Sequence, residues 1–189
     1  MPVARVLIDA NVIYSRTLLD WVSMLSVYGN MYEVVWTEDV LAEARYHLRK
    51  DKPEISDGYL TARFDRIREL FPDGRIDGFE ITNRDHPDRH DWHVVNAAAS
   101  GCVGYLVTDD AKFERLAGND DLEFETHTAD TFLTLVDDSS PGLVRRVTAK
   151  QHAYWSAKPG RRPLPYALSL AGASVFADRV QQRLQELFG

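Results

Sequence analysis

The sequence predicts an α/β fold, a sandwich built on a central parallel sheet. Short apolar runs typical of strands alternate along the chain with segments whose apolar residues recur at helical spacing. The run over residues 3–8 is almost continuously apolar, which is typical of a strand buried on both faces of a parallel sheet. Polar residues follow directly where such runs end. Ligands of open α/β sheets bind at this edge, so the pattern also indicates where a functional site would lie.

Each element follows from its local pattern. Strands are expected, in chain order, over residues 3–8, 32–36, 76–81, 105–107 and 123–126, of which 76–81 has the weakest pattern. Helices are expected over residues 18–26, 38–50, 60–71, 86–99, 113–117, 128–136, 143–157 and 175–188. Thr37 and Thr128 stand where N-caps are needed, because their hydroxyls can accept from the first free backbone amides of a helix.

The domain organisation follows from length and composition. The chain of 189 residues is long enough for one domain with an appendage. A polar break near residue 140 predicts a core domain over residues 1–138 and a helical extension over residues 139–189. The extension is basic, since residues 141–189 hold eight Lys or Arg and two acids, whereas the whole chain has a net charge of −7.

The setting of the protein is expected to be cytoplasmic. No stretch approaches the ~20 apolar residues that span a membrane, so no membrane partner is expected. The N-terminus runs straight into an apolar strand and lacks the layout of a signal peptide. Cys102 is the single cysteine and is expected to be a small buried filler. One cysteine permits no internal disulfide, which fits a reducing compartment.

Four carboxylates stand where the apolar pattern predicts burial. Asp9 and Asp110 each follow an apolar strand, while Glu43 and Asp91 lie on the inward faces of predicted helices. A lone buried carboxylate is costly, and several together raise one another's pKa unless a cation compensates. Hard divalent cations prefer such oxygen ligands. The sequence therefore predicts a Mg²⁺ or Mn²⁺ site and an enzyme that cleaves phosphodiester bonds.

Taken singly, these acids have ordinary explanations. An Asp after a strand is more often a turn residue than a ligand. Glu43 could pair with His47, one helical turn later, and Asp91 could be an acid in the first turn of a helix. Their joint occurrence at the edges of core elements favours a shared ligand.

The surrounding motifs resemble those of the PIN domain family. The motifs are Asp-Ala-Asn-Val over residues 9–12, Glu43 in a helix, Asp-x-His-Val-x-x-Ala-Ala from Asp91, and Leu-Val-Thr-x-Asp-x-x-Phe over residues 106–113. The commonest small members of that family are the toxin ribonucleases of VapBC-type toxin–antitoxin pairs. The resemblance covers residues 3–136. It implies a three-layer sandwich around the parallel sheet, a Mg²⁺ or Mn²⁺ cluster, and endonucleolytic cleavage of RNA.

The resemblance also implies roles for individual residues. The catalytic acids would be Asp9, Glu43, Asp91 and Asp110. The metal ligands among them would be Asp9, Asp91 and Asp110, with Glu43 holding or activating the attacking water. The supporting polar positions of the family are matched by Asn11 and Thr108. An antitoxin partner and a homodimer are further expectations from the resemblance.

One position departs from the family pattern. Many members have an acid just before the Phe of the last motif, and here Lys112 stands there. The departure predicts either fewer metal ligands or the use of Asp109 in place of the missing acid. The Thr-x-Asp spacing favours Asp110 as the fourth acid, with Asp109 as its competitor.

The basic extension is expected to meet a partner. Arg145, Arg146 and Lys150 lie at helical spacing with Tyr154 and Trp155 just after them. Basic residues interleaved with aromatics suit RNA backbone contact and base stacking. The alternatives are a solvated basic face or a groove that takes an acidic antitoxin segment.

Other functions remain open from the sequence. A DNA-directed nuclease would use the same acids, and a non-catalytic module would bind RNA or protein through residues 143–189. A zinc site built from His86, His90 and His93 is less favoured, because no Cys is near and His86 precedes the helix.

Overall fold

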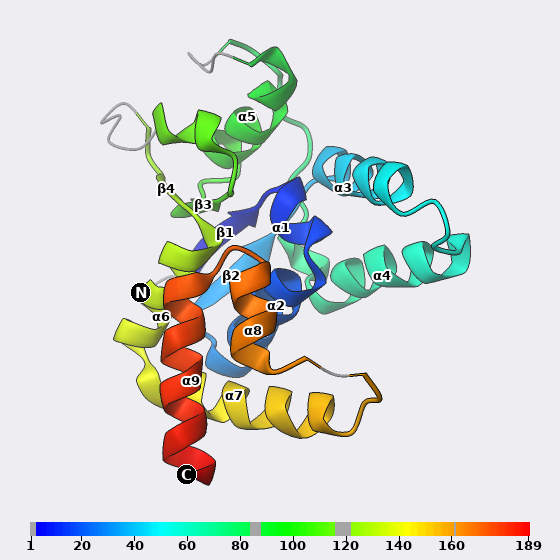
Figure 1. Cartoon of the computed structure of the whole chain (residues 1–189). Coiled ribbons are helices and arrows are strands. Elements are labelled where there is room, and N and C mark those ends of the chain that lie inside the picture. Colours follow the sequence, from blue (N-terminus) through cyan, green and yellow to red (C-terminus); the bar gives the residue numbers. More distant parts are fainter. Residues whose placement is uncertain (1–2, 84–87, 116–121, 161) are drawn as a thin grey trace. The chain divides into compact units, whose positions relative to one another are not determined.

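The computed structural model describes residues 3–83, 88–115, 122–160 and 162–189 (Figure 1). The chain divides into two units. Unit 1 consists of Met1–Tyr14 and Met31–His127, and unit 2 consists of Ser15–Asn30 and Thr128–Gly189. None of the helices in the described part of the chain is both long and apolar enough to cross a membrane.

Unit 1 is built on a parallel sheet of four strands in the order β2-β1-β3-β4, which lie side by side in Figure 1. The strands are β1 (Ala4–Ile8), β2 (Tyr32–Val35), β3 (Tyr105–Val107) and β4 (Glu125–His127). The central strand β1 pairs Leu7 with Val35 on one side and with Leu106 on the other. The predicted α/β class with a central parallel sheet is confirmed.

The continuous apolar runs are explained by burial. Three consecutive residues of β1, Val6, Leu7 and Ile8, are fully buried, and so are Val34 and Val35 of β2. Successive side chains of a strand point to opposite faces, so burial of consecutive residues means that both faces of the strand are covered. An alternating polar pattern would have left one face in water.

The helices of unit 1 are α1 (Ala10–Tyr14), α3 (Glu38–Asp51), α4 (Asp57–Leu70) and α5 (Trp92–Ser100), with 3₁₀ helices at Pro72–Gly74, Arg89–Asp91 and Ala111–Arg115. Two of the α-helices begin at a side-chain cap, α3 at Thr37 and α4 at Ser56. The hydroxyl of Thr37 accepts from the backbone amide of Val40 at 3.1 Å, as the predicted N-cap requires. The short helix α1 was not expected.

The strand expected over residues 76–81 is wrong. Trp36 and Arg75 form only an isolated bridge, and the amide of Ile76 donates to the carbonyl of Trp36 at 2.9 Å. Gly78 then adopts a φ of 69°, a left-handed conformation outside that of regular strand backbone. The chain therefore leaves the sheet after one pair of residues.

Two helix predictions are only partly described. The helix expected from residue 86 begins, within the described residues, as the 3₁₀ turn Arg89–Asp91 that leads into α5, while residues 84–87 lie outside the described part. The helix expected over residues 113–117 is instead the 3₁₀ helix Ala111–Arg115, and residues 116 and 117 are also outside the described part. Cys102 is exposed, contrary to the expected buried filler.

Unit 2 contains the helices α2 (Arg16–Gly29), α6 (Ala129–Ser139), α7 (Pro141–Ser156), α8 (Leu164–Leu170) and α9 (Ser174–Phe188). Trp21 of α2 meets Phe176 of α9 edge-on, with ring centroids 5.1 Å apart. The N-terminus of α9 has no cap from its own flanking residue. Asp130 of α6 accepts instead from the amides of Val175 at 3.0 Å and Phe176 at 2.8 Å.

Unit 2 starts earlier than the extension expected from residue 139. Helices α2 and α6, which the sequence placed in the core domain, group with α7, α8 and α9. The break near residue 140 marks a change in surface charge, whereas packing is set by buried residues such as Trp21 and Phe176. Composition and packing therefore divide this chain at different places.

Replacing Arg183 with methionine is expected to lower the free energy of unfolding of unit 2 by about 2 kcal/mol. The side chain of Asp137 is fully buried, and Arg183 Nη2 lies 3.1 Å from its Oδ1, while Arg179 Nη1 lies 3.2 Å from Oδ2. Without Arg183, the buried carboxylate keeps one cation instead of two. Urea unfolding measures the loss, with the exposed Arg162→Met as the matched control. Equal stabilities of the two variants would contradict the assigned role of Arg183.

Candidate active site

A pocket of about 360 Å³ lies in unit 1 where β1 and β3 end. It is lined by Asp9, Ala10, Asn11, Tyr14, Glu43, His47, Asp51, Asp91, Asp109 and Asp110. The lining includes every acid that the sequence singled out, drawn from four separate segments of the chain. The carboxyl edge of a parallel sheet thus gathers the polar residues that follow its strands.

Asp9 is buried at the base of this pocket and is held by three hydrogen bonds. Its Oδ1 accepts from the amide of Ala10 at 2.6 Å. Its Oδ2 accepts from Asn11 Nδ2 at 2.8 Å and from the hydroxyl of Thr108 at 2.7 Å. Asn11 and Thr108, the two expected supporting residues, therefore orient the carboxylate by direct contact.

The environment of Asp9 disfavours its charge. Burial raises the pKa of Asp9 to about 6, and the nearby carboxylates of Glu43 and Asp91 act in the same direction. The hydrogen bonds from Thr108 and Ala10 lower the pKa but do not outweigh burial. An added cation would favour the ionised carboxylate, which is the response expected of a metal ligand.

Asp109 and Asp110 are positioned by the same polar network. The hydroxyl of Thr108 accepts from the amide of Asp110 at 3.2 Å, and Asn11 Oδ1 accepts from the amide of Asp109 at 3.1 Å. Both carboxylates line the pocket, and Asp110 is the less exposed of the two. The turn after β3 is therefore tied to the turn after β1 by side chains 97 or more positions apart in sequence.

Glu43 projects from α3 between two histidines. Its Oε2 lies 3.5 Å from His93 Nε2, and its Oε1 lies 3.7 Å from His47 Nε2. His93 and, more weakly, His47 hold the pKa of Glu43 below its usual range. Burial opposes charge on His93, but Glu43 and the carbonyl of His90, 2.7 Å from Nδ1, raise the pKa of His93 overall. Glu43 is therefore an ionised carboxylate at neutral pH.

The contact between His93 and Glu43 was not predicted from the sequence, where His93 was considered as a member of the less favoured zinc site. The spacing of His93 two residues after Asp91 was the available signal. The same contact argues against the zinc alternative. A zinc ligand needs a free ring nitrogen, whereas Nε2 of His93 faces the carboxylate of Glu43 and Nδ1 faces the carbonyl of His90. His86, the first member of that zinc set, lies outside the described residues.

Asp91 reaches the pocket from an unexpected element. It ends the 3₁₀ turn Arg89–Asp91 just before α5, rather than lying within the helix. Its side chain is 14% exposed, and its Oδ2 lies 3.9 Å from the ammonium of Lys112. The turn places Asp91 in the pocket lining, two residues before His93, which contacts Glu43.

Two further lining residues, Tyr14 and Asp51, had no signal in the sequence. Tyr14 ends α1, whose last carbonyls accept from Arg63 Nη2 of α4, at 2.5 Å for Ile13 and 3.0 Å for Tyr14. The ring of Tyr14 also lies 4.9 Å from Lys52 Nζ. Because α1 was not predicted, neither was the place of Tyr14 in the pocket.

The donor set suits a hard divalent cation. Carboxylates dominate the lining, and no sulfur ligand is among them. Within the described residues, no three His, Cys, Asp or Glu side chains already stand close enough together to hold a metal ion. The carboxylates are instead held by neighbours: Asp9 by Thr108 and Asn11, and Glu43 by histidine.

The expected RNA-binding residues lie on α7 of unit 2. Arg145 and Arg146 are exposed there, and Lys150 Nζ lies 4.7 Å from the centre of the Tyr28 ring. Tyr154, one turn after Lys150, is also exposed. RNA binding by these residues stays a prediction, with exposed cations and aromatics on one helix as its basis.

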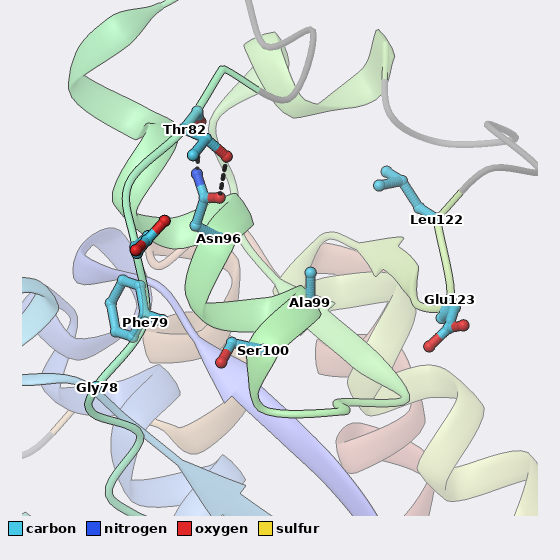
Figure 2. A pocket seen from close by; sticks show the side chains of 9 residues that line it. Gly78, Phe79, Thr82, Asn96, Ala99, Ser100, Leu122 and Glu123 are labelled. Carbon is cyan, nitrogen blue, oxygen red and sulfur yellow. Dashed lines mark hydrogen bonds between the residues drawn. The ribbon is translucent and has the colours of Figure 1, made fainter.

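A second pocket in unit 1, of about 520 Å³, was not anticipated (Figure 2). Its most buried polar residue, Asn96, donates to the carbonyls of Thr82 at 2.7 Å and Trp92 at 2.8 Å. The hydroxyl of Thr82 donates back to Asn96 Oδ1 at 3.0 Å, as Figure 2 shows. Thr82 and Asn96 of this pocket thus hold each other in place, and the acid-lined pocket is the candidate active site.

Comparisons with protein-family models, curated proteins and solved structures found no match to this chain.

Proposed function

We propose that this protein is a Mg²⁺- or Mn²⁺-dependent endoribonuclease with a PIN-like three-layer fold. The observation that carries the proposal is the pocket in which Asp9, Glu43, Asp91 and Asp110 come together at the carboxyl edge of a parallel sheet. The likeness of the motifs to toxin ribonucleases extends the proposal to a toxin paired with an antitoxin. A cytosolic setting, expected from the single cysteine, suits an RNA substrate.

Different residues of the pocket would bind the cation and orient its ligands. Asp9, Asp91 and Asp110 would hold the cation through carboxylate oxygens. When bound, a divalent cation supplies positive charge to the phosphate oxygens and lowers the pKa of water. Asn11 and Thr108 keep the Asp9 carboxylate in one orientation through the hydrogen bonds described above.

Glu43 is the candidate general base. It is ionised because His93 lowers its pKa, and its side chain is 35% exposed, so water can reach it. Glu43 would accept a proton from the attacking water as the water oxygen bonds to phosphorus. The bond from phosphorus to the 3′ oxygen breaks, and that oxygen takes a proton from solvent. The products are a 5′-phosphate and a 3′-hydroxyl.

Cleavage of labelled single-stranded RNA by the purified full chain tests the proposal. Cleavage is expected with Mg²⁺ or Mn²⁺, is expected to stop when EDTA removes the cation, and is expected to leave 5′-phosphate ends. A DNA strand of the same sequence is the comparison substrate. Faster cleavage of the DNA would favour a DNA-directed nuclease.

Three outcomes would contradict the proposal outright. Cleavage that survives EDTA would show that no divalent cation is needed. Cleavage that leaves 2′,3′-cyclic ends would show that the RNA 2′-hydroxyl attacks instead of water. RNA binding without turnover at any divalent cation would favour the non-catalytic module.

A further inference from the structure

Lys112 brings an ammonium group to the edge of the acidic cluster. Its Nζ lies 2.5 Å from Asp88 Oδ2, and 3.9 Å from both Asp91 Oδ2 and Asp110 Oδ2. Asp91 and Asp110 are two of the three proposed metal ligands. The lysine therefore contacts carboxylates that a metal ion would also use.

The position of Lys112 is defined at both ends of the residue. Its backbone amide donates to Asp110 Oδ1 at 2.9 Å, and the next residue, Phe113, is buried. At the other end, Asp88 holds the ammonium with Oδ2 while its Oδ1 accepts from the amide of His90 at 2.9 Å. The position of the ammonium is therefore set both by the backbone of Lys112 and by the fixed side chain of Asp88.

The charge of Lys112 stands next to a strongly acidic pocket. The pocket lining carries six carboxylates: Asp9, Glu43, Asp51, Asp91, Asp109 and Asp110. No Lys or Arg is among the described residues of that lining. Lys112 stands beside the lining and supplies a cation to two of its members. A charge held there offsets the same carboxylates that would attract a second metal ion.

We propose that Lys112 acts as a permanent second cation of this centre, so that Asp9, Asp91 and Asp110 bind one divalent ion rather than two. The inference rests on the proposed nuclease function and specifies its metal content. Two-metal nucleases hold both ions between shared carboxylates. Here the ammonium of Lys112 lies 3.9 Å from an oxygen of each of Asp91 and Asp110, where its charge would repel a second metal ion.

Calorimetric titration of the metal-free full chain with Mn²⁺, together with electron paramagnetic resonance of the free ion, tests the proposal. Wild type is expected to bind one equivalent at the pocket. Lys112→Gln removes the charge at similar length, and Mn²⁺ affinity is expected to rise about tenfold. Lys112→Asp adds a carboxylate and is expected to bind two equivalents. Lys50→Gln, at an exposed lysine of α3, is the matched control and is expected to leave affinity unchanged.

Each outcome decides a separate point. Two equivalents in wild type would overturn the role of Lys112, and so would a Lys112→Gln affinity equal to that of Lys50→Gln. Thermal melts in EDTA establish that each variant is folded, and Lys112→Gln carries the test if Lys112→Asp does not fold. One bound Mn²⁺ without RNA cleavage would overturn the ribonuclease proposal alone. No Mn²⁺ binding by folded wild type would overturn both proposals.

Discussion

Asp9→Asn is expected to slow metal-dependent RNA cleavage by about 10³-fold. Asp9 is the most buried acid of the pocket, and its Oδ2 is oriented by Thr108 and Asn11. The amide keeps the size of the side chain but removes the negative charge that would bind the cation. Single-turnover cleavage of RNA, measured at saturating Mg²⁺, gives the ratio of rates.

The control for this prediction is Asp73→Asn, a change at an exposed Asp outside the pocket. It is expected to cleave RNA at the wild-type rate. If Asp9→Asn cleaves as fast as Asp73→Asn, Asp9 is no part of the reaction centre. Circular dichroism of both variants separates loss of the site from loss of the fold.

Without metal, the stability of the protein is expected to fall as the pH rises. Relative to Asp9→Asn, the wild-type protein in EDTA is expected to lose about 2–3 kcal/mol of free energy of unfolding between about pH 4 and pH 8. Burial raises the pKa of Asp9 from its ordinary value of 3.8 to about 6 in the folded protein. The folded state therefore binds the Asp9 proton more tightly than the unfolded state does.

Because the folded state binds the proton more tightly, protonation of Asp9 stabilises the folded protein. The stabilisation is complete below the unfolded pKa of 3.8 and is lost as the pH rises through the folded pKa of about 6. The carboxylates of Glu43 and Asp91 face Asp9 and strengthen the effect, whereas Thr108 and the amide of Ala10 weaken it. Urea unfolding of both proteins across this range gives the difference, in which the other titrating groups largely cancel.

Parallel pH curves for wild type and Asp9→Asn would show that burial does not perturb Asp9. Added Mg²⁺ is expected to restore wild-type stability at the high end of the range and to leave Asp9→Asn unchanged. This pair of results would link the unfavourable charge of the metal-free site to metal binding. The active-site carboxylate would then lower stability and be required for function, as strained functional groups often do.

Much of the fold was predictable because it depends on local sequence. The apolar residues 6–8 of β1, 34 and 35 of β2, and 106 and 107 of β3 are fully buried. Thr37 caps α3 through a hydroxyl that accepts from an amide only three residues away. Strand 76–81 failed because a local apolar pattern cannot report that Gly78 turns the chain away from the sheet. The short α1 escaped detection because five residues carry too little periodicity.

The candidate site was predictable only in part. Asp9 and Asp110 could be found from their positions after strands, and the parallel sheet explains why they meet. The partners of those acids could not be found this way. The bond between Asn11 and Thr108 joins residues 97 apart, and the ion pair of Lys112 with Asp88 joins residues 24 apart.

The sequence by itself determined the class of the fold, the strands β1, β2 and β3, and the acids that end or flank core elements, because these depend on periodicity and on neighbours within a turn or two. The tertiary structure alone decided the strand order β2-β1-β3-β4, the meeting of His93 with Glu43, and the placement of Lys112 beside Asp91 and Asp110. It also decided that α2 belongs with the C-terminal helices. Such contacts depend on which distant segments pack together. The packing energy comes from many residues at once, so no single position in the sequence reveals it.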